Sequence, residues 1–318
     1  MSDEKILIIT GASGFVGSNF TKKWSNKHTL YGLDIRQPNV EGVVHTYGWD
    51  ELQDIPKADA IVHLAGKAHD TKNESLAQDY FDINVGLTKK VFDWFLTSEA
   101  QTFVFFSSVK AAADYVPGDI LTEDVKPNPV GAYGESKIKA ERYILSKCEE
   151  YERLGKRVYI VRPCMIHGPG NKGNLNLLYN VVSKGVPWPL GSYENRRSFC
   201  SIDNIAYVVE QLIVNENVPN GIYHVCDDEA LSTNELIALI AQSVNKSPRI
   251  WRLPKTLMNT FASVGGALRL PLTKERLQKL TENYVVSNEK VKKALNITQM
   301  PVSAEEGLTK TLKSFQTK

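Results

Sequence analysis

The sequence is poor in cysteine, and its cysteines stand apart from one another. Cys148, Cys164, Cys200 and Cys226 form no C-x-x-C pair, and no histidine lies beside them at a metal-ligand spacing. A structural disulfide framework and a zinc site are both excluded by this spacing. We therefore expect four reduced thiols packed in a core and no bound metal.

Long hydrophobic runs and a strong net charge are also missing. No apolar run approaches the ~20 residues that a membrane span needs, and the polar start Met-Ser-Asp-Glu-Lys lacks the layout of a signal peptide. Lys and Arg number 38 against 36 Asp and Glu, a net charge of +2, so no overall field attracts nucleic acid or an anionic membrane. We expect a cytoplasmic protein with neither of these partners, in which any anion site is local.

What the 318 residues do contain is an ordinary globular composition, with 42% apolar and 23% charged residues. In the first half, short apolar runs alternate with longer amphipathic segments, which is typical of a parallel sheet covered by helices. The predicted strands are 6–10, 29–33, 60–64, 102–107 and 158–162. The predicted helices between them are 13–24, 79–96 and 132–151.

The pattern changes after residue 162. Residues 167–197 are rich in Gly, Pro and Asn and predict long loops around one helix at 175–184. A helix at 202–214 and a strand at 221–225 follow, and Ser232/Glu235 and Ser303/Glu306 have capping-box spacing. We predict an α/β fold with a doubly wound sheet in 1–166, a return segment 199–228, and a smaller, mostly helical lobe from 167–198 and 229–318.

A glycine-rich turn follows the first strand. In Gly11-Ala-Ser-Gly14-Phe-Val-Gly17 the glycines allow a backbone to approach a pyrophosphate, and the next helix offers free N–H groups at its N-terminus. The alternative is a turn that only packs helix on strand. The second strand ends at Asp34, at about the spacing from the first glycine expected of the carboxylate that binds the adenosine ribose. Asp34 favours NAD over NADP, although Arg36 stands nearby.

Tyr133 and Lys137 are four residues apart in a helical stretch and can face one site. A cationic lysine lowers the pKa of a phenol, which ordinarily lies near ~10. Ser107 and Ser108 close an earlier strand, at the sheet edge where parallel strands line a ligand site. By itself the Tyr-x-x-x-Lys spacing is also typical of a surface helix pair.

Together, these residues closely resemble the extended short-chain dehydrogenase/reductase family, in particular its nucleotide-sugar epimerases, dehydratases and ketoreductases. The resemblance runs through nearly the whole chain. It is carried by the glycine loop, Asp34, His63-Leu-Ala-Gly66, Asn84-Val-Gly-Leu-Thr88, Ser107-Ser108, Tyr133-x-x-x-Lys137, Arg162-Pro163, Gly168-Pro-Gly170 and Arg197-Ser-Phe-x-x-Ile-Asp203.

The resemblance implies catalytic roles for Tyr133 as acid/base, Lys137 as the residue that lowers its pKa, and Ser108 as a ligand of the reacting sugar oxygen, with Ser107 structural. His63 is expected in the core, and a cofactor role for Asn84 is as plausible as a structural one. The implied NAD-binding residues are Gly11, Ser13, Gly14, Phe15, Val16, Gly17, Asp34, Leu64, Ala65, Gly66, Asn84, Tyr133, Lys137 and Pro163.

On the substrate side, the resemblance implies that Arg197 binds the diphosphate of a nucleotide sugar and that Asn174 also contacts the substrate. Arg196 could equally bind substrate or lie in a solvated loop. The stretch Lys172-Gly-Asn-Leu175 is similar to reductases of UDP-4-keto-6-deoxy-N-acetylglucosamine, whereas Ser201-Ile-Asp-Asn204 is nearer to epimerases. We expect an NAD-dependent epimerase or reductase acting at hexose C4, with a UDP-N-acetylhexosamine as substrate.

Three further expectations follow. The dehydratases of this family carry an Asp-Glu pair after the catalytic hydroxyl residue, and Val109 and Lys110 stand there instead, which argues against dehydration. A catalytically silent NAD(P)-sensing protein on the same fold is the alternative of a different class. The resemblance also suggests a homodimer.

Overall fold

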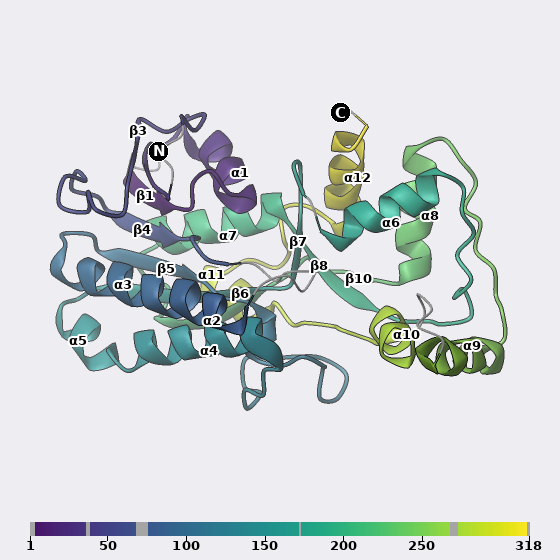
Figure 1. Cartoon of the computed structure of the whole chain (residues 1–318). Coiled ribbons are helices and arrows are strands. Elements are labelled where there is room, and N and C mark those ends of the chain that lie inside the picture. The colour runs from purple at the N-terminus through teal and green to yellow at the C-terminus, as the bar shows by residue number, and fades with distance from the viewer. Residues whose placement is uncertain (1–3, 36–38, 68–75, 172, 268–272, 317–318) are drawn as a thin grey trace.

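A seven-stranded parallel sheet forms the centre of the computed structural model, which describes residues 4–35, 39–67, 76–171, 173–267 and 273–316 (Figure 1). The strand order is β3-β2-β1-β4-β5-β6-β9. The strands are β1 Ile6–Thr10, β2 Thr29–Leu33, β3 His45–Tyr47, β4 Ala60–His63, β5 Thr102–Phe106, β6 Arg157–Pro163 and β9 Gly221–Val225. The order reverses between β1 and β4, so the predicted doubly wound fold is confirmed.

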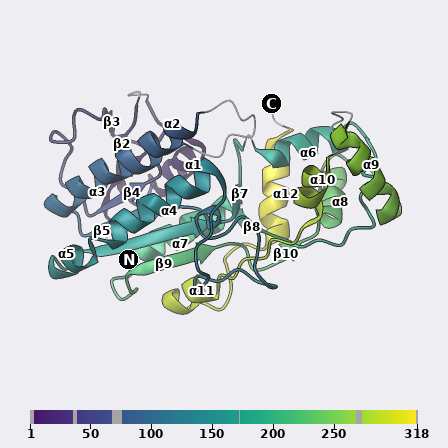
Figure 2. The same ribbon diagram turned by 60° about the horizontal axis from the view of Figure 1, so that its bottom comes forward.

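Helices cover both faces of this sheet because its strands are apolar on both sides. Along β5, Val104 and Phe106 face one core, and Phe103 and Phe105 face the other. The first core is covered by α1 Phe15–Trp24, α7 Ile202–Val214 and α11 Glu289–Leu295. The second is covered by α3 Thr88–Thr97, α4 Gly131–Leu145 and α5 Cys148–Arg153 (Figure 2).

Two predicted helices are interrupted in the structure. The stretch predicted as 79–96 consists of α2 Ala77–Phe81, the π-helix η1 Asp82–Leu87 and α3. The stretch predicted as 132–151 breaks at Ser146 and Lys147 into α4 and α5, which lets Tyr151 pack edge-on against Phe92 in the second core. Both interruptions are decided by contacts with distant residues, which local periodicity does not encode.

A second, smaller region extends from one end of the main sheet (Figure 1). Its three-stranded sheet, order β10-β8-β7, consists of β7 Met165–His167, β8 Arg197–Ser201 and β10 Ala230–Leu231, and none of these strands was predicted. β7 and β8 flank the stretch 167–197 in which loops were expected. Its helices are α6 Asn174–Ser183, α8 Thr233–Ser243, α9 Lys255–Ala267, α10 Lys274–Thr281 and α12 Ala304–Ser314. We call this region the lobe.

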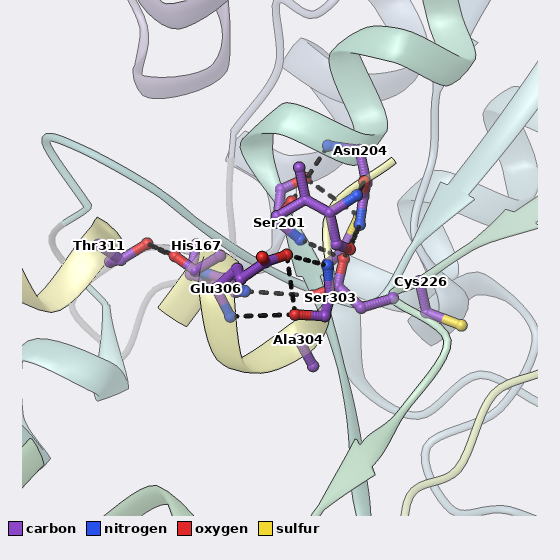
Figure 3. A network of polar contacts seen from close by, with 12 residues as sticks. His167, Ser201, Asn204, Cys226, Ser303, Ala304, Glu306 and Thr311 are labelled. Carbon is purple, nitrogen blue, oxygen red and sulfur yellow. Dashed lines mark hydrogen bonds and ion pairs between the residues drawn. The ribbon is translucent and has the colours of Figure 1, made fainter. Parts of the chain in front are cut away.

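The C-terminal helix α12 is joined to the main body by buried polar contacts (Figure 3). His167 lies between Thr311 of α12, at 2.9 Å, and Asp227, at 3.4 Å. Asn204 of α7 exchanges two hydrogen bonds with the backbone of Val302, just before α12. The predicted capping boxes at Ser303 and Ser232 are both confirmed, at the starts of α12 and α8.

The segment 199–228 contributes α7 and β9 to the central layers. Within 229–318, which the prediction assigns to the lobe, α11 packs on β9 and α7. The division into 1–166 with 199–228, and 167–198 with 229–318, stays a prediction. Within the described residues, no helix is both long and apolar enough to cross a bilayer, and the same residues hold no cluster of metal-ligating side chains.

Candidate active site

The glycine-rich turn forms an open helix N-terminus at the carboxyl edge of β1. Gly11 has a φ of +69°, and a Cβ there would lie 3.0 Å from the backbone of Ala65. A Cβ on Gly17 would lie 2.3 Å from the carbonyl oxygen of Gly11, so neither position accepts a side chain without a backbone shift. Gly14 is the exposed N-cap of α1, with no side-chain cap and no acidic residue in the first turn. This cradle of N–H groups fits a pyrophosphate.

Asp34 lies at the end of β2 against this turn. Its Oδ2 accepts hydrogen bonds from the Ser13 N–H, at 3.0 Å, and the Ser13 hydroxyl, at 2.6 Å, while Oδ1 accepts one from the N–H of Ile35. The carboxylate therefore braces the turn in addition to the ribose-binding role predicted for it. Arg36, the alternative influence on cofactor choice, lies outside the described residues.

The segment after β4 runs beside the glycine turn. His63 is buried between the hydroxyls of Thr10, at 2.7 Å, and Thr88, at 3.0 Å. Burial, with the nearby Lys137 charge, lowers its pKa to about 3, so the imidazole is neutral at physiological pH and is a core residue, as predicted. Leu64, Ala65 and Gly66 follow, and the Thr10 hydroxyl accepts the N–H of Ala65.

Asn84 lies in the π-helix, next to the same segment. Its Oδ1 accepts the N–H of Lys67 at 2.8 Å, and its Nδ2 donates to the carbonyl of Lys67 and the hydroxyl of Ser136. The side chain thus fixes the β4 loop to α4, and π-helical turns often occur at functional sites. A Cβ on Gly66 would lie 2.8 Å from Asn84 Oδ1 and 3.3 Å from Lys137 Nζ, so this glycine lets the loop pass the lysine closely.

Ser108, Tyr133 and Lys137 meet at the carboxyl edge of β5. Ser108 follows the strand as N-cap of the short helix η2 (Val109–Ala111) and shares a hydrogen bond with the phenol of Tyr133. A Cβ on Gly134 would lie 2.6 Å from the carbonyl oxygen of Lys110, so α4 packs directly on η2. This close packing brings the first turn of α4, which carries the tyrosine, to the serine.

Burial acts on the two ionisable groups in opposite senses. Burial raises the pKa of Tyr133, and the Ser108 hydrogen bond opposes this shift. Burial lowers the pKa of Lys137 to about 8, and the charge of Glu141 opposes it, so the lysine stays cationic at neutral pH. Lys137 Nζ donates to the carbonyl of Phe106 at 2.8 Å, which fixes the ammonium at the end of β5.

Sequence reasoning missed Glu141, one turn beyond Lys137 on α4. Its carboxylate is fully buried and takes two hydrogen bonds from Arg162 of β6, at 2.9 Å from Nε and 2.5 Å from Nη2. It also accepts the hydroxyl of Ser107, which supports the structural role predicted for that serine. The spacing Lys137-x-x-x-Glu141 was the available signal, because it puts the carboxylate on the same helix face as the lysine.

The predicted substrate residues lie on lobe elements. Arg197 begins β8; its guanidinium donates through Nη2 to the carbonyl of Lys279 and lies 3.9 Å from Glu282. Burial lowers its pKa, and its buried Nε has no acceptor among the described residues, which fits a diphosphate ligand. Asn174 is exposed at the start of α6. Pro163, which was predicted to bind the cofactor, lies on the main sheet as the last residue of β6. Lys172 lies outside the described residues.

The fold and this edge together define an α/β dinucleotide-binding enzyme with a Ser-Tyr-Lys site. Residues 7–226 match the model of the NAD dependent epimerase/dehydratase family, and the chain belongs to this family. The predicted family, its enzyme class and NAD as its cofactor are thereby confirmed, and the relatives place the chain among nucleotide-sugar epimerases and reductases.

Two curated relatives match almost end to end. The chain is 27% identical over 326 residues to a UDP-glucose 4-epimerase of Vibrio cholerae, covering 98% of this chain and 95% of the relative. It is 28% identical over 331 residues, with the same coverage, to an N-acetyl-α-D-glucosaminyl-diphospho-ditrans,octacis-undecaprenol 4-epimerase of Escherichia coli O157:H7. Among solved structures, the UDP-N-acetylglucosamine 4-epimerase from Bacillus cereus has a TM-score of 0.76 at 17% identity, covering 97% and 98% of the two chains.

Proposed function

We propose that the protein is an NAD-dependent 4-epimerase of a diphosphate-linked sugar, with a UDP-N-acetylhexosamine as its substrate. The observation that carries this is the meeting of Ser108, Tyr133 and Lys137 beside an open glycine cradle. The two relatives that match end to end, both 4-epimerases, support the choice of carbon. Their substrates carry different groups on the sugar diphosphate, and Arg197 suits that shared anion.

In this mechanism Tyr133 takes the proton of the C4 hydroxyl and later returns it to the same oxygen, while Ser108 holds that oxygen. The configuration at C4 would invert because the hydride returns to the opposite face of the carbon. Lys137 supplies the positive charge that favours the phenolate, and burial makes that charge effective by excluding water. NAD, when bound, supplies reversible hydride transfer at C4. Asn84 and Gly66 keep the β4 loop against Lys137, and Arg197 orients the diphosphate.

The neighbours of Ser108 argue against dehydration. Val109 is buried and has no proton to transfer, and Lys110 forms an ion pair with Asp114 at 2.8 Å. Removing the C6 hydroxyl would require a further acid and base beside the tyrosine. We therefore propose redox chemistry at C4 alone.

A reductase of a 4-keto-6-deoxy sugar is the second candidate. The stretch around Asn174 is similar to such reductases, and a GDP-6-deoxy-D-mannose reductase of Pseudomonas aeruginosa is 25% identical over 254 residues. An epimerase retains NAD through the turnover, whereas a reductase exchanges the cofactor in every cycle. The silent NAD-sensing alternative is disfavoured because the tyrosine and lysine are both present and placed together.

Incubation with two sugars separates these functions. Conversion of UDP-N-acetylglucosamine to its C4 epimer without added cofactor is the result we expect. Stoichiometric oxidation of NADH or NADPH with the 4-keto-6-deoxy derivative would identify the reductase instead, and release of a 4-keto-6-deoxy product from the first sugar would refute the exclusion of dehydration. Tyr133→Phe provides the control, because it must abolish whichever activity is observed.

Asp34 carries the proposed preference for NAD over NADP. Its carboxylate lies at the turn that holds the adenosine side and repels a 2′-phosphate. Fluorescence titration of the protein with NADH and NADPH is expected to give tighter binding of NADH by about tenfold or more, and Asp34→Asn should reduce the gap. Equal or reversed affinities in the unmodified protein would overturn this proposal. We also propose that the protein forms a homodimer and is cytoplasmic. Sedimentation velocity tests the oligomeric state.

A further inference from the structure

Charge is distributed very unevenly along the chain, although its sum is close to zero. The 39 residues 236–274 contain six Lys and Arg and no Asp or Glu. The rest of the chain carries 32 basic and 36 acidic residues. A net charge of +6 is thus concentrated in a segment that includes α9 and the strand-like stretch before it, and the remainder has a net charge of −4.

The same segment exposes large apolar side chains. Trp251 is 56% exposed, Phe261 54% and Leu257 41%. Leu257 and Phe261 are four residues apart and form one stripe of α9. The neighbouring stripe, Met258 and Ala262, is buried against Leu190 and Leu277, so α9 has one face that packs in the lobe and an adjoining apolar stripe that faces solvent.

Three exposed basic residues, Arg249, Arg252 and Lys255, precede this stripe in the chain. Arg249 donates to the carbonyl of Gly185, and the Lys255 ammonium lies over the ring of Tyr193. We call the three basic residues together with Trp251, Leu257 and Phe261 the α9 surface. Helix α9 itself lies at the end of the lobe away from the main sheet, as both views of the ribbon show (Figures 1 and 2).

We propose that the α9 surface docks on an anionic lipid bilayer. Aromatic and aliphatic side chains on a helix flanked by Lys and Arg match the interface of such a bilayer, where apolar groups enter the headgroup boundary and cations meet lipid phosphates. The absence of any acid across residues 236–274 supplies the charge complementarity. The proposed contact is peripheral and reversible. The proposal departs from the expectation that no membrane is a partner, which was drawn from the net charge of the whole chain.

Co-sedimentation with vesicles tests the proposal without any measurement of catalysis, so its outcome is independent of the proposed function. We expect the full chain to bind vesicles of 40% phosphatidylglycerol in phosphatidylcholine, to bind pure phosphatidylcholine at least tenfold more weakly, and to be released at 1 M salt because screening weakens the charge contacts. No dependence on phosphatidylglycerol would overturn the proposal.

Two double variants locate the contact. Leu257→Ser/Phe261→Ser removes the apolar stripe, and Arg252→Gln/Lys255→Gln removes two charges; each should weaken vesicle binding by about tenfold or more. Their matched controls are Val44→Ser/Leu154→Ser and Lys22→Gln/Lys57→Gln, which alter exposed residues of the same kinds around the main sheet. The controls should retain binding, and an equal loss in them would overturn the assignment to α9.

Folding and self-association are checked on the same samples. NADH affinity and melting temperature should be unchanged in Arg252→Gln/Lys255→Gln, because both residues are exposed. If Leu257→Ser/Phe261→Ser fails to fold, the charge variant therefore still tests the proposal. If the α9 variants instead split an oligomer in sedimentation velocity, and the original protein does not bind the anionic vesicles, the surface is covered by a second copy of the chain and the bilayer proposal is wrong.

Discussion

The main sheet and the lobe are stabilised in different ways. The sheet region buries charged groups deep among its strands and helices: Lys137, Glu141 and Arg162 are all at most 6% exposed. Ion pairs within the lobe lie nearer to solvent, as Lys279 with Glu275 and Arg197 with Glu282 illustrate. Buried charges are expensive and rigid, whereas exposed pairs contribute little. The region expected to perform the chemistry is therefore the one that retains costly groups.

The largest expected effect tests the chemistry of the sheet region. Tyr133→Phe removes one hydroxyl and little contact area, so kcat should fall by about 10²- to 10⁴-fold while NADH binds as before. Turnover assays paired with NADH titration provide the measurement. A kcat near that of the original protein would remove Tyr133 from the mechanism.

The contrast in ion pairs is tested by two alanine variants. Glu141→Ala leaves the Arg162 guanidinium buried without its carboxylate and should lower the free energy of unfolding by about 3 to 5 kcal/mol. Lys279→Ala removes an exposed partner of Glu275 on the same lobe helix and should cost less than about 1 kcal/mol. Urea unfolding compares the two, with Glu141→Gln as the variant that keeps the volume. Equal costs would contradict the distinction.

Lys137 should make the stability of the sheet region depend on pH. Its folded pKa of about 8 lies below the ordinary 10.5, so folding disfavours the charged form. The unfolded chain then binds more protons between these values, and the free energy of unfolding should rise as the pH increases from 8 to 10.5. Lys137→Met should remove this rise. It should also stabilise the protein at pH 7 by on the order of 1 to 3 kcal/mol. The loss of the hydrogen bond to the Phe106 carbonyl reduces this gain.

Urea unfolding at pH 7 and at pH 10 measures this effect for both proteins. The variant should be inactive although it is more stable, which is the expected trade between function and stability. If Lys137→Met were less stable than the original protein at pH 7, the lysine would be a net stabilising group and the assigned cost would be wrong.

A small effect is also expected at the N-caps of the lobe helices. Ser303 and Ser232 each cap a helix by accepting the N–H of the residue three positions on, and each should lose about 1 kcal/mol on replacement by alanine. The NADH affinity should stay unchanged in both. A cost of several kcal/mol for Ser303→Ala alone would show that the contacts of α12 with His167 and Asn204 depend on its cap.

The sequence determined the sheet region almost completely. Apolar runs bounded by turns predict β1, β2, β4, β5 and β6 within one residue at each end, because strands buried on both faces leave a local signal. The short edge strand β3 was not predicted. Short-range motifs also predicted much of the candidate site. The glycine turn and the Tyr133–Lys137 pair each lie within one local element, and Asp34 was predicted from its distance along the chain from Gly11.

Only the tertiary structure decided the features that depend on distant partners. The π-helix at Asn84 depends on Lys67 and Ser136, and β8 pairs with β7 and β10, which lie far from it in the chain. The role of Glu141 on helix α4 depends on Arg162, 21 residues away on strand β6. Net charge gave no sign of the α9 surface, because a sum over the whole chain conceals the place where the charges gather and which side chains are left exposed there.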